Sequence, residues 1–83
     1  MSTHLDFFID TILAVKTKKE MHMFLLGIFT PQELEEIPTR LQIVKMLKQG
    51  VSQHQIAKEL KVGVATVTRG SKEIQKGRFK NIK

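Results

Sequence analysis

The segment from Ser52 to Arg69 contains the residues that most clearly indicate a function. Ser52-Gln53-His54-Gln55 has the form of a capping box, in which the first and last side chains each bond the other residue's backbone N–H. Ala57 is small enough to let two helices approach, and Lys61-Val62-Gly63 has the length of a tight turn. A capped helix, a small contact residue, a turn and a second helix define a helix-turn-helix, which we predict over about residues 52–75.

The second helix of this motif carries short side chains near its N-terminal half. Short side chains let a helix enter the major groove of DNA, where threonine hydroxyl and methyl groups can meet base edges. Lysines beside such a helix can contact phosphates. The predicted groove-facing residues are Val64, Ala65, Thr66, Thr68 and Arg69, and the predicted phosphate contacts are Lys58, Lys61 and Lys72. An ordinary helical hairpin with a basic, solvated surface is the alternative interpretation.

The 83-residue chain has a formal net charge of +6 that is unevenly distributed. Residues 1–40 hold four Lys or Arg against six Asp or Glu, whereas residues 41–83 hold ten against two. A basic half of this kind favours a polyanionic partner, and nucleic acid is the one we predict. An alternative is a small helical interaction module whose basic tail binds an acidic protein surface.

Missing residue types exclude several classes of protein. The chain has no Cys, which excludes disulfides, thiolate metal sites and thiol nucleophiles. His4, His22 and His54 share no metal-ligand spacing, and we find no nucleophile–base pair and no phosphate-binding loop. We therefore predict a protein that is not an enzyme and has neither a metal nor a cofactor.

The N-terminal residues resemble neither a secretory signal nor a membrane anchor. Residues 1–10 have no basic start, and Asp6 and Asp10 interrupt their apolar run. No stretch approaches the roughly 20 apolar residues that a membrane span requires. We therefore expect a cytoplasmic protein with no membrane partner.

Helical periodicity outlines the elements that must position these residues. Thr30-Pro31-Gln32-Glu33 is a second capping box, and Gly50 is a natural helix stop. Pro38 disfavours helical geometry at Ile37, so we expect one helix to end there and another to begin. From Lys76 the chain is basic and aperiodic, which predicts a frayed tail over 76–83. The predicted helices cover roughly residues 3–15, 21–27, 31–37, 38–49, 53–60 and 64–75, with a polar break at 16–19.

Two sets of apolar residues predict how these helices pack. The helix-turn-helix core is expected to consist of Ile56, Leu60, Val62 and Val67. The helix over 38–49 has Leu41, Val44 and Leu47 on one face, with Ile43 and Met46 beside it. A chain this short buries little apolar surface alone, so we expect a homodimer.

The string Val64-Ala65-Thr66-Val67-Thr68-Arg69-Gly70-Ser71 closely resembles the tryptophan (Trp) repressor family. The match continues with nearly constant spacing through Ser52-Gln53, Ile43-Val44, Thr39-Arg40 and Thr30-Pro31, and covers about residues 24–72 well. The resemblance implies a single domain over 1–83 that forms an intertwined, all-α dimer. It also implies a repressor of double-stranded operator DNA with L-tryptophan as corepressor.

The resemblance further implies which residues bind the corepressor. Arg40 and Arg69 would sandwich the indole ring, as planar guanidinium groups can, and Thr30 with Arg69 would hold the carboxylate. Val44 would line the slot and Gly70 would leave room beside the helix. The carbonyls of Gly27 and Phe29 would accept from the ligand ammonium. Implied DNA contacts are Gln53, His54, Val64, Ala65, Thr66 and Thr68. Alternatively, Arg40 pairs with Glu36, Thr30 is only a cap, and Gly70 ends its helix early.

The sequence departs from the family pattern at several positions. Glu73 replaces a small polar residue near the ligand ammonium, and Gly27 replaces a bulkier apolar residue. His54 replaces a basic DNA contact, Ala57 replaces a Lys, and the loop at residues 50–52 is one residue shorter. The chain stops at Lys83, where the family continues into a helix that helps close the dimer. These departures motivate an alternative, a helix-turn-helix regulator that is constitutive or responds to a different small ligand.

Overall fold

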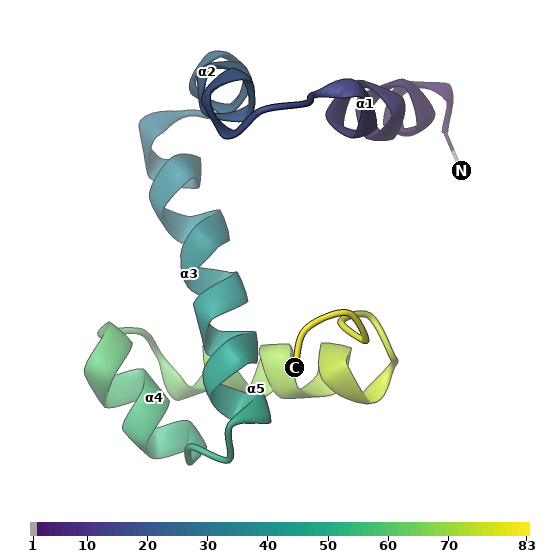
Figure 1. Ribbon diagram of the computed structural model, residues 1–83. Helices are drawn as coiled ribbons and strands as arrows, with labels where there is room; N and C mark the ends of the chain where they lie inside the picture. Colours follow the sequence, from purple (N-terminus) through teal and green to yellow (C-terminus); the bar gives the residue numbers. More distant parts are fainter. Residues whose placement is uncertain (1) are drawn as a thin grey trace. The chain divides into compact units, whose positions relative to one another are not determined.

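The computed structural model describes residues 2–83. Within that range the chain has five helices and no strand, which confirms the predicted all-α class (Figure 1). The helices divide between two compact units, one ending at Leu34 and the other spanning Glu35–Lys83. The helices are α1 (Thr3–Ala14), α2 (Lys18–Ile28), α3 (Pro31–Lys48), α4 (Gln53–Leu60) and α5 (Val64–Gln75).

Side-chain caps begin the two helices of the first unit. The hydroxyl oxygens of Ser2 and Thr17 each accept from the backbone N–H three residues on, at 3.1 Å. Such caps satisfy one of the N–H groups that the first turn of a helix leaves unpaired. Because Thr17 is the cap, α2 begins at Lys18, and the predicted start at Met21 is wrong.

The apolar side chains of α1 and α2 form no buried core within residues 2–34. Phe8 and Phe24 contact each other, with ring centroids 6.3 Å apart. Neither helix has a buried residue, however, and Phe7, Leu13 and Met23 are 74%, 77% and 63% exposed. These helices therefore keep an apolar surface that a single chain leaves uncovered.

The helix α3 is continuous through Pro38, so the prediction of two helices meeting there is wrong. The capping box at its start is confirmed, because the Thr30 N–H donates to Glu33 Oε1 at 2.9 Å and the Glu33 N–H donates to Thr30 Oγ1 at 3.1 Å. Pro38 removes only the N–H that would have reached the Leu34 carbonyl. Pro38 is exposed, so water can bond to that carbonyl instead. The bias against helix at Ile37 is overridden by intact helical turns on both sides.

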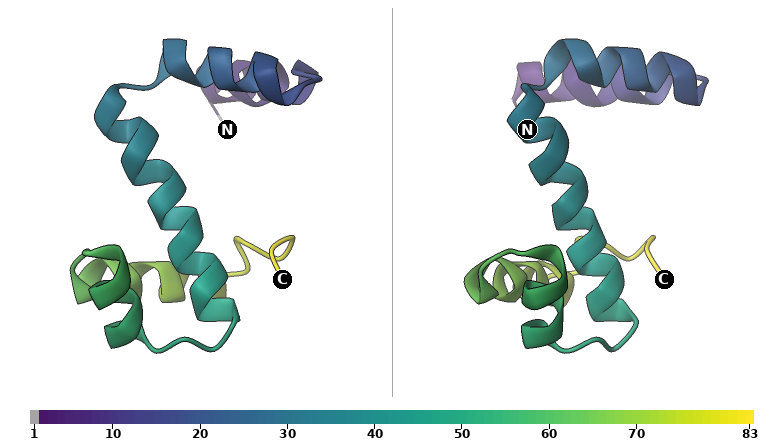
Figure 2. Two further views of the ribbon diagram at one scale, coloured as in Figure 1. Left: turned by 60° about the vertical axis from the view of Figure 1, so that its left-hand side comes forward. Right: turned by 90° about the vertical axis from the view of Figure 1, so that its left-hand side faces the viewer.

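The second unit has a small core where α3, α4 and α5 meet. Both views in Figure 2 place α4 and α5 beside the C-terminal half of α3. The predicted contribution of Ile56 and Val67 is confirmed, since both are fully buried. On α3, Ile43 and Met46 are buried, whereas Leu41 is 49% exposed in the single chain. The core contains Ile43, Met46, Ile56, Ala57 and Val67, with Leu47, Val51, Leu60 and Val62 packed against it.

Two turns set the directions of α4 and α5. Gly50 stops α3 with φ +86°, and the bonds from Gly50 N–H to Leu47 O (3.0 Å) and from Val51 N–H to Met46 O (3.1 Å) complete a Schellman motif. Between α4 and α5 the left-handed residue is Lys61, with φ 56°, and not Gly63. A side chain in this conformation costs about 1 kcal/mol relative to glycine, so the turn is strained at Lys61.

Residues 76–82 fold back as a series of turns, which we call the C-terminal hook. Gly77, with φ +80°, lets the Arg78 N–H reach Glu73 O at 3.2 Å. The Lys48 ammonium then donates to the backbone carbonyls of Phe79 and Ile82. The expectation of a frayed tail is therefore wrong for these residues, because a lysine distant in sequence binds their backbone.

Gly70 is the point of closest approach between α5 and α3. It lies inside α5, so the alternative that it ends the helix is wrong. A Cβ built on Gly70 would lie 3.1 Å from Ile43 Cγ2 and 3.7 Å from Leu47 Cδ1. Ile43 is only 1% exposed, so its methyl group has little room to move.

No helix of the described chain is long and apolar enough to cross a membrane.

We predict opposite effects for alanine at two glycines that both lie inside helices. Gly27→Ala should raise the free energy of unfolding by roughly 0.5–1 kcal/mol, because nothing lies within 4 Å of its Cβ. Gly70→Ala should lower it by about 1 kcal/mol, because the clash with Ile43 exceeds the same gain in helix propensity. Denaturant unfolding at one protein concentration measures both. Equal stabilisation by the two substitutions would contradict the close approach at Gly70.

Candidate functional site: a guanidinium-lined pocket beside a basic helix

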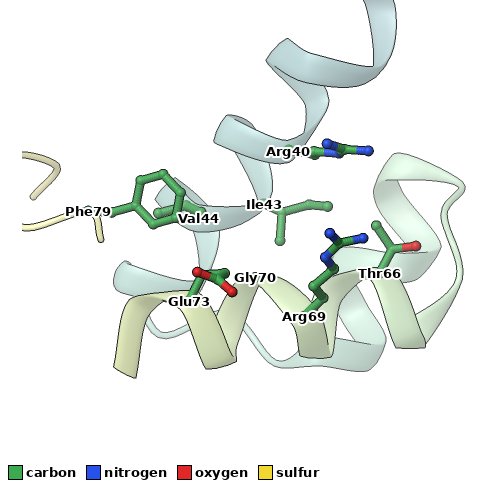
Figure 3. A pocket seen from close by; sticks show the side chains of 8 residues that line it. All are labelled: Arg40, Ile43, Val44, Thr66, Arg69, Gly70, Glu73 and Phe79. Atoms are coloured by element: carbon green, nitrogen blue, oxygen red, sulfur yellow. The ribbon is translucent and has the colours of Figure 1, made fainter. Parts of the chain in front are cut away.

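A cavity of about 440 Å³ lies between α3 and α5 in the second unit (Figure 3). Small-molecule sites span roughly 300–1,000 Å³, so the cavity has the size of a ligand pocket. Five of the predicted ligand-binding residues line it, namely Arg40, Val44, Arg69, Gly70 and Glu73. The full lining consists of Arg40, Ile43, Val44, Thr66, Arg69, Gly70, Glu73 and Phe79.

Two guanidinium groups lie toward one end of the pocket. Arg40 comes from α3 and Arg69 from α5, and the side chain of Arg69 rises toward Arg40 (Figure 3). Within residues 2–83 neither forms an ion pair, and the alternative Arg40–Glu36 pair is not observed. Unpaired planar cations of this kind can stack on an aromatic ring or bind a carboxylate with two hydrogen bonds.

The middle of the pocket is apolar. Ile43 and Val44 of α3 are 1% and 2% exposed, and they line the cavity together with Gly70 of α5 (Figure 3). Gly70 has no side chain to fill this space, and its backbone packs closely against the side chain of Ile43. The glycine therefore serves both the helix contact and the floor of the pocket.

Glu73 and Phe79 line the other end of the pocket (Figure 3). Glu73 Oε1 lies 3.3 Å from Lys76 Nζ, and Oε2 lies 3.4 Å from Arg78 Nε. Both carboxylate oxygens are thus already paired with cations of the chain. The site that the resemblance assigns to a ligand ammonium is here a partly exposed ion-pair cluster, whose individual pairs contribute little stability.

Sequence reasoning missed three contributions to the pocket, one of which is Ile43, predicted only as an apolar residue of its helix. Phe79 belongs to the segment expected to fray, and no periodicity marks it. Thr66 was predicted to face DNA, and it also lines the cavity. The predicted ligand residues Gly27, Phe29 and Thr30 are not among the lining residues and belong to the first unit.

The basic surface predicted to contact DNA is carried by α4 and α5. His54, Lys58, Lys61 and Lys72 are exposed, as are Val64, Ala65, Thr66 and Arg69 of α5. Gln53 and Thr68 are only half-buried, and the Thr68 hydroxyl lies 2.7 Å from Gln53 Oε1 and 3.1 Å from Val64 O. This hydrogen bond between residues predicted to face DNA joins α4 to α5. The Ser52 cap is confirmed, because the Ser52 hydroxyl oxygen accepts from the Gln55 backbone N–H at 3.2 Å. The other half of the predicted capping box is wrong, because the Gln55 side-chain amide donates to Glu59 Oε1 at 2.7 Å instead of bonding to the Ser52 N–H.

No group of three or more potential metal-binding side chains occurs within residues 2–83.

The described residues combine a basic pair of helices with a pocket that has guanidinium groups and an apolar floor. Such a combination is typical of ligand-responsive regulators that bind nucleic acid.

Comparison with known proteins identifies the family. The family model for the Trp repressor protein matches residues 3–81, and the chain belongs to this family. The family comprises regulatory DNA-binding proteins, so the prediction that the chain is not an enzyme is confirmed. No solved structure gives a significant match.

Curated relatives carry the same family name. The chain is 40% identical over 68 residues to a Trp operon repressor homolog of Vibrio vulnificus strain YJ016, covering 81% of this chain and 67% of the relative. It is 40% identical over 68 residues to that of Vibrio cholerae, covering 81% and 66%. It is 43% identical over 67 residues to that of Aliivibrio fischeri strain MJ11, covering 78% and 62%. The chain thus spans about two thirds of these relatives.

The Thr68–Gln53 contact leads to a prediction about stability. Thr68→Val should lower the free energy of unfolding by about 1 kcal/mol, because it removes a hydrogen bond between α4 and α5 and leaves the Gln53 oxygen without this donor. Thr66→Val is the matched control, because within the described chain its hydroxyl makes no hydrogen bond. Denaturant unfolding of both variants measures the difference. Equal stabilities would show that the contact does not hold the two helices together.

Proposed function

We propose that this protein is a dimeric, sequence-specific transcriptional repressor whose binding to double-stranded operator DNA is activated by L-tryptophan. The observation that carries this proposal is the position of Arg69, which lines the pocket and lies on the exposed, basic surface of α5. A ligand held by Arg69 therefore contacts the same helix that would read DNA. Family membership and the names of the relatives support the same function.

In this proposal α4 and α5 form the helix-turn-helix, and α5 enters the major groove. The exposed short side chains of Ala65 and Thr66 allow close approach to base edges. Lys58, Lys61 and Lys72 contact phosphates on either side, which positions the helix but carries no sequence information. Release of counterions from these phosphates makes the affinity fall with rising salt concentration.

L-tryptophan suits the pocket in size and polarity. The indole would lie between the guanidinium groups of Arg40 and Arg69 and against the apolar floor at Val44. The carboxylate would bind the guanidinium group of Arg69.

Binding would act on DNA affinity by fixing α5. The walls of the pocket come from α3 and α5, so a ligand between them favours one orientation of α5 over others. A ligand shifts such an equilibrium only by its differential affinity for the two states. Weak helix formers in the first turns of α5, among them Val64, Thr66 and Gly70, keep the free helix easy to reorient.

A second copy of the chain is proposed to cover the apolar surface of α1 and α2. Neither helix has a buried residue in one chain, and Phe7, Leu13 and Met23 are more than half exposed. An intertwined homodimer would bury these side chains. Helix-turn-helix dimers, the Trp repressor itself among them, place two recognition helices about 34 Å apart, so we expect a near-palindromic operator.

A second candidate function is a helix-turn-helix regulator that is constitutive or responds to a different small ligand. The ion pairs of Glu73 with Lys76 and Arg78 favour it, because they occupy the carboxylate nearest to the expected ligand ammonium. Operator binding that does not change when tryptophan is added would support this candidate.

The first test uses the composition of the chain, which contains neither Trp nor Tyr. The fluorescence anisotropy of L-tryptophan should rise saturably as protein is added, against an almost dark protein background. Arg69→Ala should abolish this rise and also abolish tryptophan-dependent binding to a duplex selected from a randomised library. Lys45→Ala, which removes an exposed charge outside the pocket, is the control and should retain both. Full ligand affinity in Arg69→Ala would show that the pocket is assigned wrongly.

A second test separates DNA contact from folding. Lys61→Gly should raise the free energy of unfolding by about 1 kcal/mol, because glycine relieves the left-handed conformation. The same variant should bind the selected duplex more weakly and with a smaller salt dependence, because it loses a phosphate contact. Thermal unfolding and anisotropy titrations at several salt concentrations measure the two effects. Unchanged duplex affinity in the stabilised variant would contradict a phosphate contact by Lys61.

A further inference from the structure

The C-terminal hook is bonded to both helices that form the walls of the pocket. On the α3 side, the Lys48 ammonium donates to the backbone carbonyls of Phe79 and Ile82. On the α5 side, Arg78 Nε lies 3.4 Å from Glu73 Oε2, and the Arg78 N–H donates to Glu73 O at 3.2 Å. Phe79 of the hook also lines the pocket between these helices (Figure 3). The hook therefore links α3 to α5 in addition to their direct packing.

The link on the α3 side depends on one side chain. Lys48 is half-buried at the C-terminal end of α3, and its ammonium binds two backbone carbonyls. A hydrogen bond from a charged donor contributes more than one between neutral groups. The ion pairs of Glu73 on the α5 side are partly exposed, so each contributes little. Lys48 is therefore the side chain whose loss should loosen the hook most.

We propose that the C-terminal hook restrains α5 against α3 before any ligand binds, and that Lys48 is the positioning residue that fixes the hook to α3. The proposal rests on the proposed function, because it concerns how far the orientation of α5 depends on a ligand. A hook bonded to both walls favours the arrangement in which the pocket is formed. A ligand that binds only this arrangement has an apparent affinity proportional to its population. Duplex binding by the ligand-free protein depends on the same population.

Loosening the hook should therefore change several affinities in a linked way. The affinity for L-tryptophan and the duplex affinity of the ligand-free protein should fall by the same factor, because both are proportional to the population with a formed pocket. Duplex affinity at saturating tryptophan should stay the same, since the ligand then holds α5 in place. The factor by which tryptophan raises duplex affinity should consequently increase. The intact hook thus makes DNA binding less dependent on the ligand.

Two variants loosen the hook in different ways. Lys48→Met removes the ammonium. Gly77→Ala places a side chain where the backbone has φ +80° and where a Cβ would lie 3.0 Å from Lys80 Cε, and it leaves the charge unchanged. Neither residue lines the pocket. Lys45→Met removes the same charge as Lys48→Met from an exposed position on α3, and is the matched control.

The first measurement needs neither ligand nor DNA. In wild type and in Lys45→Met, the heteronuclear NOE values of the backbone N–H groups of residues 79–82 should be close to those of α5. They should fall in Lys48→Met and in Gly77→Ala, while far-UV circular dichroism checks that the helices of each variant are intact. Unchanged NOE values in Lys48→Met would overturn the role of Lys48 in fixing the hook.

The second measurement compares tryptophan binding with duplex binding. Lys48→Met should weaken binding of L-tryptophan about tenfold and Gly77→Ala about fivefold, as judged by the fluorescence anisotropy of the ligand. Each variant should weaken ligand-free binding to the selected duplex by its own same factor and should match wild type at saturating tryptophan. Lys45→Met should leave the ratio of the two duplex affinities unchanged. A lysine that only contacted phosphate would instead lower duplex affinity equally with and without tryptophan.

The outcomes separate this inference from the proposed function. A loosened hook with an unchanged ratio of duplex affinities with and without tryptophan would overturn the restraint of α5 and leave the repressor function standing. Wild-type duplex binding that does not respond to tryptophan would overturn the proposed corepressor. The restraint would then be judged by ligand-free duplex affinity alone, and an undiminished affinity in Lys48→Met and Gly77→Ala would overturn it as well.

Discussion

The second unit depends on the close contact between α5 and α3 at Gly70. A Cβ at this position would lie 3.1 Å from the buried methyl group of Ile43, so a larger residue could fit only if the two helices or the Ile43 side chain shifted. That spacing brings Arg69 of α5 toward Arg40 of α3 and leaves an apolar floor between the two helices (Figure 3). The cost of glycine in a helix, about 1 kcal/mol, is offset by the packing that it allows.

The helix α5 contributes residues both to the pocket and to the basic surface. Thr66 and Arg69 line the cavity and are also exposed on α5, so one helix presents residues to both. Such an arrangement needs no long chain of interactions between two distant sites, because the reading helix is itself a wall of the ligand site. The hydrogen bond from Thr68 to Gln53 links α5 to α4, which carries part of the basic surface.

The charges of the C-terminal half have different roles according to their partners. The lysines of α4 and α5 point to solvent and are suited to a polyanion, whereas Lys76 and Arg78 pair with Glu73. Lys48 binds backbone carbonyls and holds the hook against the pocket. The net charge of this half therefore overstates the number of cations that are free to contact phosphates.

The features that depend on local interactions could be predicted from the amino-acid sequence. The capping residues Thr30 and Ser52, the stop at Gly50 and the extent of α5 follow from hydrogen bonds between residues close together in the chain, and all are observed as predicted. The family was also recognisable, because its motif in α5 is a short contiguous string. Three features became visible only in the folded chain: α3 continues through Pro38, Phe79 lines the pocket, and Gln53 accepts a hydrogen bond from Thr68. These features depend on solvent exposure or on contacts between residues far apart in the chain, and neither leaves a periodic signal in the sequence.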